Sequence, residues 1–494
     1  MSRSVSKKAA PLPVLQVCAE IFPLLKTGGL ADVAGALPSA VRAQGVDMRV
    51  LLPGFAPILA GMVSAREVAR LPARGDVPAA RLLYGRLPAC ECDAYVIDAP
   101  ALYLREGGPY ADARQQPFAD NHLRFARLGW AAAEIANGVD SQWVPRVVHA
   151  HDWHAGLVPT CMRQLAVAAR SVFTIHNLAY QGLFPGETFQ ELGLPAACFA
   201  MDGLEFYGQV SFMKAALQDA DRITTVSPRY AREIQMAEQG MGLDGLLRSR
   251  ATRLSGILNG VDTAVWNPAR DAAIAAPYTA QDLRGKAVCK AALQAELGLQ
   301  AAPERLLLTV VSRLTEQKGL PLLQVNLPKL LQRGVQIAML GSGDAELEQA
   351  FTAIAKAHPL QVAVRLGYDE PLAHRLIAGA DVILVPSLFE PCGLTQLYGL
   401  AYGTLPLVRH VGGLADTVVD CSLEALQEHT ASGFVFHDFS PEAMDAALRR
   451  AELLYGQPTF WQQLQRTGMA QRHDWEAAAT RYAGLYRDCW TAAK

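Results

Sequence analysis

The chain alternates short, uninterrupted apolar runs with longer segments rich in alanine and leucine. Apolar runs of this length, rich in β-branched residues, are typical of strands buried on both faces, and the segments between them have helical spacing. Strands that alternate with helices in this way usually pair in parallel. The predicted strands are residues 14–18, 49–52, 146–150, 171–175, 222–226, 256–258, 306–312, 336–340, 362–366, 381–386 and 405–409. The sequence therefore predicts an α/β protein built on parallel sheets.

A glycine-containing segment near the start of the chain occurs again near its end. Gly-Gly-Leu-Ala-Asp at residues 28–32 returns at residues 412–416, and each copy opens a predicted helix. With 494 residues, the chain is also longer than one hydrophobic core usually supports. We therefore expect a flexible tail at residues 1–11 and two Rossmann-like domains, at residues 12–257 and 258–474. We expect a final helix at residues 475–494 to pack on one of these two domains, and packing on the N-terminal domain is one alternative.

Composition and charge argue against several classes of protein. Hydrophobic residues make up 51% and charged residues 19%, as in soluble globular proteins, and the formal net charge is −2. This balance gives no positive field to attract nucleic acid or an anionic membrane, and no apolar stretch reaches the roughly 20 residues of a spanning helix. The nine cysteines are scattered and odd in number, which indicates reduced, buried thiols. We expect a cytoplasmic protein with neither nucleic acid nor membrane as a partner.

The loop after the first apolar run is a candidate anion site. In parallel sheets, ligands bind beyond the carboxyl ends of the strands, where Lys26, Gly28 and Gly29 are expected. Paired glycines at a helix start let backbone N–H groups approach an anion, and Lys26 adds a positive charge. The spacing matches neither the Walker P-loop nor G-x-G-x-x-G. A phosphate site and a plain tight turn both fit this loop.

The polar cluster His-Ala-His-Asp-Trp-His begins at His149, at the end of another predicted strand. A metal site of the metallo-β-lactamase type has H-x-H-x-D-H, in which the aspartate stands one place later. We therefore expect Asp152 to cap the following helix and the cluster to face a ligand, with zinc as the alternative. His176 and Asn259 follow two further predicted strands. A single residue of this kind is often structural, but several at equivalent strand ends indicate a site.

The second half of the chain carries a second set of candidates. Arg313 and Lys318 follow the predicted strand at residues 306–312, and two cations in one loop can neutralise a diphosphate. Tyr368 follows another strand and can stack on a base. Glu390 precedes a glycine-opened helix, where a carboxylate can bind sugar hydroxyls and backbone N–H groups a phosphate. A solvated turn is the alternative for the cationic loop.

These motifs together resemble the bacterial glycogen synthases and plant starch synthases, and the resemblance runs from about residue 12 to the C-terminus. The segments that carry it are KTGGLAD, HAHDWHAGL, FTIHNLAYQG, LNGVD, SRLTEQKGL and FEPCGLTQLYGL. The resemblance implies a retaining glycosyltransferase of the GT-B fold, with two Rossmann-like domains facing across a cleft. It implies ADP-glucose as donor, glycogen or another α-1,4-glucan as acceptor, and neither a metal nor a cofactor.

The resemblance also assigns expected roles to individual residues. Donor phosphates would meet Lys26, Gly28 and Gly29 from one domain and Arg313 and Lys318 from the other. Tyr368 would stack on adenine and Glu390 would hold glucose hydroxyls, while the glucose and acceptor side would be lined by Asp152, His176 and Asn259. Backbone donors near the phosphate or sugar would come from Gly393, Leu394 and Thr395. The expected catalytic residues are Asp152, His176, Arg313, Lys318 and Glu390.

Two positions depart from patterns seen in related enzymes. Many retaining GT-B enzymes carry a second glutamate eight residues after the first, where this chain has Tyr398, a difference shared with the glycogen synthase branch. Val411 stands where threonine is frequent in relatives. We expect that Val411 removes one polar contact near the diphosphate.

Retention of configuration can proceed through a covalent carboxylate intermediate or by front-face attack with the leaving phosphate as base. No carboxylate is clearly suited to the covalent route, so we expect front-face transfer, with domain closure on donor binding. Three other classes remain open. A glucan phosphorylase would need a pyridoxal lysine, a metallohydrolase would hold zinc, and a glucan-binding protein would have no use for cations around a diphosphate.

Overall fold

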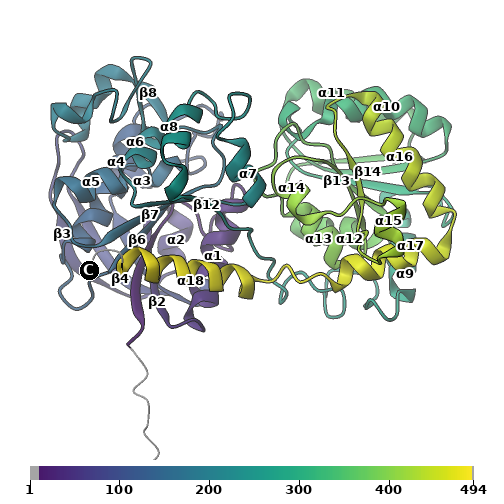
Figure 1. Cartoon of the computed structure of the whole chain (residues 1–494), viewed down its shortest axis with the longest axis horizontal. Coiled ribbons are helices and arrows are strands. Elements are labelled where there is room, and N and C mark those ends of the chain that lie inside the picture. The colour runs from purple at the N-terminus through teal and green to yellow at the C-terminus, as the bar shows by residue number, and fades with distance from the viewer. Residues whose placement is uncertain (1–9, 492–494) are drawn as a thin grey trace, which may run out of the picture. The chain divides into compact units, whose positions relative to one another are not determined.

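The computed structural model describes residues 10–491, so most of the tail predicted at residues 1–11 lies outside the described residues. The chain divides into two compact units (Figure 1). The first unit holds the chain up to Val226, Ala231–Gly260 and the chain from Trp475 onward, and the second holds Ser227–Tyr230 and Val261–Asp474. Among the described residues, no helix has the length and apolar character needed to cross a bilayer.

The first unit is built on a nine-stranded sheet with the order β12-β11-β7-β6-β1-β2-β5-β4-β3. Its strands are β1 (Leu12–Val17), β2 (Val46–Pro53), β3 (Val63–Leu71), β4 (Ala80–Leu87), β5 (Cys92–Asp98), β6 (Val147–His151), β7 (Arg170–Ile175), β11 (Arg222–Thr225) and β12 (Leu254–Gly256). All pairs from β12 to β5 are parallel, whereas β4 and β3 pair antiparallel at one edge. The strand order reverses at β1, which lies between β2 and β6. This is the topological switch point of a doubly wound sheet.

Helices and a small second sheet complete the first unit. The helices are α1 (Gly29–Arg42), α2 (Ala56–Gly61), α3 (Pro100–Tyr103), α4 (Asn121–Ala136), α5 (Val158–Gln164), α6 (Phe212–Asp219), α8 (Asp244–Ser249) and α18 (Trp475–Thr491), and α7 (Pro228–Glu233) spans the division between the units. The small sheet has the order β8-β10-β9, from Leu183–Pro185, Gln209–Ser211 and Glu205–Phe206. The C-terminal helix α18, yellow in Figure 1, packs on α1 and shares a buried core with β1 and β2.

The second unit holds a six-stranded, fully parallel sheet with the order β15-β14-β13-β16-β17-β18. Its strands are β13 (Leu307–Val311), β14 (Gln336–Gly341), β15 (Val362–Leu366), β16 (Val382–Val385), β17 (Leu405–Arg409) and β18 (Phe434–Phe436). Its helices are α9 (Arg284–Leu297), α10 (Leu320–Gln332), α11 (Ala345–Ala357), α12 (Glu370–Gly379), α13 (Thr395–Ala401), α14 (Gly412–Thr417), α15 (Leu423–Gln427), α16 (Pro441–Tyr455) and α17 (Pro458–Ala470). The order reverses at β13, so the switch point lies between β13 and β16.

Most predicted parallel strands are present, but the parallel strands β5 and β18 and the antiparallel edge of the first sheet were missed. β3 is largely exposed, and β4 alternates between buried and exposed residues, so neither contains a continuous apolar run. Such alternation is typical of antiparallel strands with one solvated face. The run predicted at residues 256–258 overlaps β12 only at Gly256, because the strand ends there.

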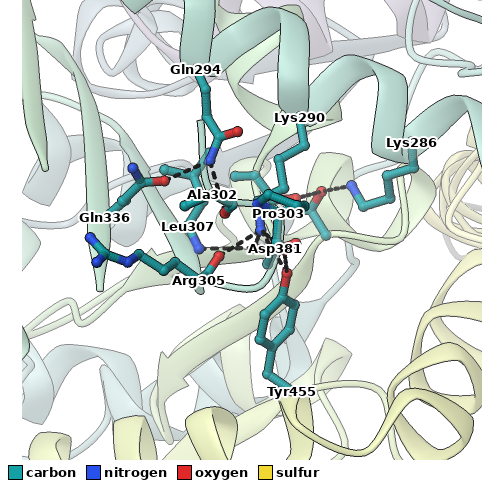
Figure 2. A network of polar contacts seen from close by, with 12 residues as sticks. Lys286, Lys290, Gln294, Ala302, Pro303, Arg305, Leu307, Gln336, Asp381 and Tyr455 are labelled. Carbon is teal, nitrogen blue, oxygen red and sulfur yellow. Dashed lines mark hydrogen bonds and ion pairs between the residues drawn. The ribbon is translucent and has the colours of Figure 1, made fainter. Parts of the chain in front are cut away.

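A buried ion pair joins α9 to the amino-terminal edge of the second sheet (Figure 2). The Lys290 ammonium donates to Asp381 Oδ2 and to the Tyr455 hydroxyl, both at 2.6 Å, and to two backbone carbonyls. Asp381, which precedes β16, also accepts from the backbone N–H of Leu307 at 2.8 Å. Burial raises the pKa of the Asp381 carboxyl, and the charge of Lys290 opposes that rise. The pair therefore ties the starts of β13 and β16 to one helix, at the edge opposite the carboxyl ends.

Breaking this pair on one side should destabilise the fold strongly. We expect Lys290→Met to lower the free energy of unfolding by about 3–5 kcal/mol, because Asp381 then stays buried without the ammonium that hydrogen-bonds it. The double variant K290M/D381N should recover part of that loss, since asparagine still accepts from Leu307. Urea unfolding of the full chain, followed by circular dichroism, measures both effects. Equal losses in the single and double variants would show that the charge of Asp381 does not matter.

Candidate active site

At the switch point of the first unit, a buried glutamate holds the glycine-containing loop. Glu20, only 2% exposed, follows β1. Its carboxylate accepts from the backbone N–H and the hydroxyl of Thr27, both at 2.5 Å, and from the Tyr110 hydroxyl. The neighbouring Lys26 ammonium lies 2.9 Å from Asp32 Oδ1. The loop that carries Lys26 is therefore anchored by side chains on both sides of it.

Gly28, which follows this loop, faces open space. Gly28 has an extended backbone with φ −163°, which any residue can adopt, and a Cβ placed on it would meet nothing within 4 Å. Gly29 is the first residue of α1. Neither packing nor conformation therefore demands a glycine at position 28. The first turn of α1 has room in front of it for a ligand that approaches its backbone N–H groups.

Asp152 joins the carboxyl ends of β6 and β7. Its Oδ1 accepts from the backbone N–H groups of His176 at 3.0 Å and Asn177 at 3.4 Å. The prediction that Asp152 caps the following helix is wrong, because its side chain is turned toward β7 and makes no capping bond. Its backbone has φ +58°, a conformation that costs energy in any residue but glycine. Burial raises the pKa of its carboxyl to about 7, and the two N–H groups partly oppose that rise.

Burial lowers the pKa of the histidines of the cluster and keeps them neutral, and hydrogen bonds hold the rings of His149 and His151. His149 Nδ1 lies 2.8 Å from the Tyr486 hydroxyl of α18, and its Nε2 lies 2.6 Å from Thr174 Oγ1. His151 Nδ1 lies 2.9 Å from His176 Nε2. Burial lowers the pKa of His149 and His176 to about 3. The described residues include no group of three His, Cys, Asp or Glu side chains placed to share a metal ion.

Asn259 also belongs to the first unit, where it follows β12. Its side chain is 7% exposed, and its Oδ1 has no hydrogen-bond partner among the described residues. A buried amide oxygen without a partner costs free energy unless a ligand supplies a donor. Asn259 is therefore a candidate contact for a ligand hydroxyl.

At the switch point of the second unit, Lys318 and Glu390 form an ion pair. Lys318 follows β13 and Glu390 follows β16, and Nζ lies 2.6 Å from Oε2. The same carboxylate oxygen accepts from the Ser387 hydroxyl at 2.8 Å, and Glu390 is 6% exposed. The structure thus brings together two predicted site residues from loops that the chain separates widely. With both of these donors on one oxygen, the carboxylate is held in one orientation.

The remaining predicted residues of the second unit lie at strand and helix ends of the same sheet. Arg313 follows β13 and donates to Gln317 Oε1 at 3.3 Å. Tyr368 follows β15, is 70% exposed, and its hydroxyl donates to Glu370. The segment before α13 and the first residue of that helix contain Gly393, Leu394 and Thr395.

The second glycine turn has a different function from the first. Gly412 has φ +48°, and a Cβ on it would overlap the carbonyl oxygen of Glu390. The next residue, Gly413, donates its N–H to that same carbonyl at 3.1 Å. The glycines are therefore needed to support the loop that carries Glu390. Val411, just before them, is 2% exposed in the hydrophobic core, so the prediction that it replaces a polar contact near a diphosphate is wrong.

Tyr398 is part of an aromatic stack. Its ring lies 3.8 Å from that of Trp266, at 6° between planes. His374 stacks on Trp266 at 3.8 Å as well, and its Nδ1 lies 2.7 Å from Asp271. A glutamate at position 398 would lose this stack, which explains the tyrosine by packing alone.

Sequence reasoning missed Glu20, Thr27, Tyr110 and Ser387. The sequence could have indicated Glu20, because this residue stands directly beyond the first predicted strand, where ligand-facing residues are expected. No sequence pattern could have indicated Tyr110, since it lies in a loop far along the chain and contacts Glu20 only in the folded structure. Its ring also stacks on His154 at 4.5 Å, which connects the glycine loop to the histidine cluster.

Comparison with known proteins agrees with this arrangement. The family model of the starch synthase catalytic domain matches residues 13–249, and that of the glycosyl transferases group 1 matches residues 298–465. A glycogen synthase of Leptothrix cholodnii is 64% identical to this chain, over 96% of this chain and 99% of its own. The glycogen synthases of Edwardsiella ictaluri and Francisella philomiragia are 57% and 54% identical, each over 96% of this chain and 99% of their own.

Solved structures give the same result. The catalytic domain of starch synthase IV from Arabidopsis thaliana, bound to ADP and acarbose, matches with a TM-score of 0.88 at 30% identity, over 97% of this chain and all of its own. A sucrose-phosphate synthase from Thermosynechococcus elongatus matches with a TM-score of 0.59 at 18% identity, a likeness of fold alone. The predicted fold class, α/β of the GT-B type, is confirmed, and the chain belongs to the glycogen synthase family of hexosyltransferases.

Proposed function

We propose that this chain transfers glucose from ADP-glucose to the non-reducing end of an α-1,4-glucan, with retention of configuration and release of ADP. The single observation that carries this proposal is the 64% identity to a glycogen synthase along nearly the whole of both chains. The starch synthase whose structure matches binds ADP, which supports an adenine nucleotide as the leaving group. We place the reaction in the cytoplasm, where a nucleotide sugar is available.

The ion pair of the second unit fits the donor side of this reaction. Lys318 and Arg313 stand in one loop at the switch point, where cations would stabilise the charge that develops on the departing diphosphate. Tyr368 is 70% exposed and would stack on adenine, and backbone donors would come from Gly393, Leu394 and Thr395. Glu390, held by Lys318 and Ser387, would accept hydrogen bonds from glucose hydroxyls.

The first unit fits the sugar and acceptor side. Lys26 stands beside the open turn at Gly28 and Gly29, where a phosphate would bind. His176 is neutral and partly exposed, and its Nδ1, the ring nitrogen that does not bond His151, would hydrogen-bond a sugar hydroxyl. Asn259 offers its unpartnered amide oxygen to another.

The contacts of the carboxylates favour front-face transfer over a covalent intermediate. A nucleophilic carboxylate must be ionised and free to approach the anomeric carbon. Glu390 is bound by an ammonium and a hydroxyl at one oxygen, and Asp152 is bound by backbone N–H groups and has a raised pKa. In the proposed step the C1–O bond to ADP breaks, the acceptor hydroxyl forms the new bond on the same face, and the leaving phosphate takes the hydroxyl proton. Asp152 would position His176 through its backbone.

Nucleotide release tests this function directly. We expect ADP release from ADP-glucose that depends on added glycogen, with little UDP release from UDP-glucose. A preference for UDP-glucose would overturn the proposed donor while keeping the reaction. Phosphate-dependent release of glucose 1-phosphate from glycogen, without nucleotide release, would identify a phosphorylase instead.

Removing the charge of Lys318 should slow catalysis with little effect on folding. We expect Lys318→Gln to lower kcat by about 10²–10³-fold, the usual loss for one group that stabilises transition-state charge. The glutamine amide can still donate to Glu390, so the urea midpoint should change little. Lys329→Ala, at an exposed position of α10, is the matched control and should keep full activity. A K318Q variant with unchanged kcat would remove Lys318 from the proposed donor site.

Asp152→Asn should separate stability from activity. Between the ordinary pKa of 3.8 and the raised value of about 7, the folded chain binds a proton that the unfolded chain has released. The contribution of Asp152 to the free energy of unfolding therefore falls as the pH rises through this window. D152N keeps the acceptor oxygen and does not ionise, so at pH 8 it should be more stable than the parent chain, on the order of a few kcal/mol.

This advantage should shrink toward pH 4, and the variant should keep most of its transferase activity, because its amide oxygen still accepts from the backbone N–H of His176. Urea unfolding at the two pH values measures the stability difference, and nucleotide release measures the activity. A stability difference that is equal at both pH values would show that Asp152 ionises normally in the folded chain.

A further inference from the structure

His151 is a buried imidazole to which the proposed mechanism has given no task. It stands in β6, its side chain is fully buried, and its ring lies between those of His149 and His176 at centroid distances of 4.0 and 5.2 Å. Its Nδ1 is hydrogen-bonded to His176 Nε2 at 2.9 Å. Its Nε2 is buried and has no partner among the described residues.

Two neutral imidazoles that share one hydrogen bond must take opposite roles. Burial lowers the pKa of both His151 and His176, so each ring carries one proton and one bare nitrogen. If His151 donates from Nδ1, its unpartnered Nε2 is a bare lone pair. If His151 accepts at Nδ1, its Nε2 carries a buried N–H without an acceptor. Orphaned buried N–H groups are rarer in proteins than unfilled lone pairs, so the first arrangement is favoured.

This assignment also determines which ring nitrogen of His176 carries its proton. When its Nε2 accepts from His151, its own proton must be on Nδ1, the nitrogen left for a ligand. We propose that His151 is a positioning residue whose Nδ1–H holds His176 as the Nδ1–H tautomer, so that His176 presents a hydrogen-bond donor to an oxygen of the sugar substrate. The identity of that ligand rests on the proposed function, but the tautomer does not.

Neighbouring contacts hold both rings of this pair in place. His149, whose ring packs against that of His151, has its two nitrogens bonded to the hydroxyls of Tyr486 and Thr174 and so has none to offer His151. The backbone of His176 is held separately by Asp152 Oδ1. His176 is therefore oriented through its main chain by one residue and through its ring by another.

Nitrogen NMR of the ligand-free, full-length protein tests the tautomer without any reference to activity. In a chain labelled with ¹⁵N-histidine, the shifts of the ring nitrogens separate a protonated atom from a bare one, and His151→Asn and His176→Asn spectra assign the signals. We expect protonated Nδ1 and bare Nε2 in both residues near pH 7. A protonated Nε2 on His176 would overturn the proposal, even if the chain proves to be a fully active glucosyltransferase.

Substitution tests whether the hydrogen bond matters for turnover. Asparagine can place an amide N–H near the position of Nδ1, whereas leucine fills similar space without a donor. We expect His151→Leu to lower kcat about 10-fold, the loss of one hydrogen bond, with the KM for ADP-glucose within about two-fold. His151→Asn should restore most of kcat and keep His176 protonated at Nδ1.

Three outcomes would contradict a positioning role for His151. One is an unchanged kcat in H151L, and another is an equal loss of kcat in both variants. The third is an H151L spectrum in which His176 keeps its tautomer while kcat falls. If H151L does not fold, the wild-type spectrum and the H151N variant still decide the question. If the wild-type chain transfers no glucose, the proposed function fails while the tautomer is still measured.

Discussion

In a doubly wound parallel sheet, the helices that follow the two neighbouring strands at the switch point lie on opposite faces of the sheet. The loops at the carboxyl ends of these two strands therefore separate and leave room that no side chain of the sheet fills. Both units have this reversal, at β1 and β6 in one and at β13 and β16 in the other. Each unit places its candidate charged side chains at that point. The location of the site follows from strand order before any individual residue is considered.

Buried carboxylates connect this topology to chemistry. Glu20, Asp152 and Glu390 are each almost fully buried, and each is held by specific donors. Burial of a carboxylate is costly unless donors are arranged around it, so each of them fixes the loop that supplies those donors. Asp381 shows the contrast at the opposite edge of the sheet. There, Lys290 and the backbone satisfy the carboxylate, and the ion pair serves only to join a helix to two strand starts.

Identical sequence segments can serve different purposes because their neighbours differ. The segment Gly-Gly-Leu-Ala-Asp faces open space at Gly28 but lies against the backbone of the Glu390 loop at Gly412. Packing also accounts for Tyr398 and Val411, since the first stacks on Trp266 and the second lies in the hydrophobic core. None of these differences is visible in the segment itself. Each depends on which distant residues the fold brings against it.

Local pattern alone determined the α/β class, most of the parallel strands and the loops that carry Lys26, Lys318 and Glu390. These features are predictable because buried parallel strands are continuous apolar runs, and because ligand-binding residues follow such runs directly. Tertiary structure alone decided the antiparallel edge formed by β3 and β4, whose half-exposed strands lack such runs. It also decided that Tyr110 reaches Glu20 and that His151 bonds His176. A hydrogen bond between distant residues depends on strand register and side-chain direction, which a pattern of neighbouring residues does not specify.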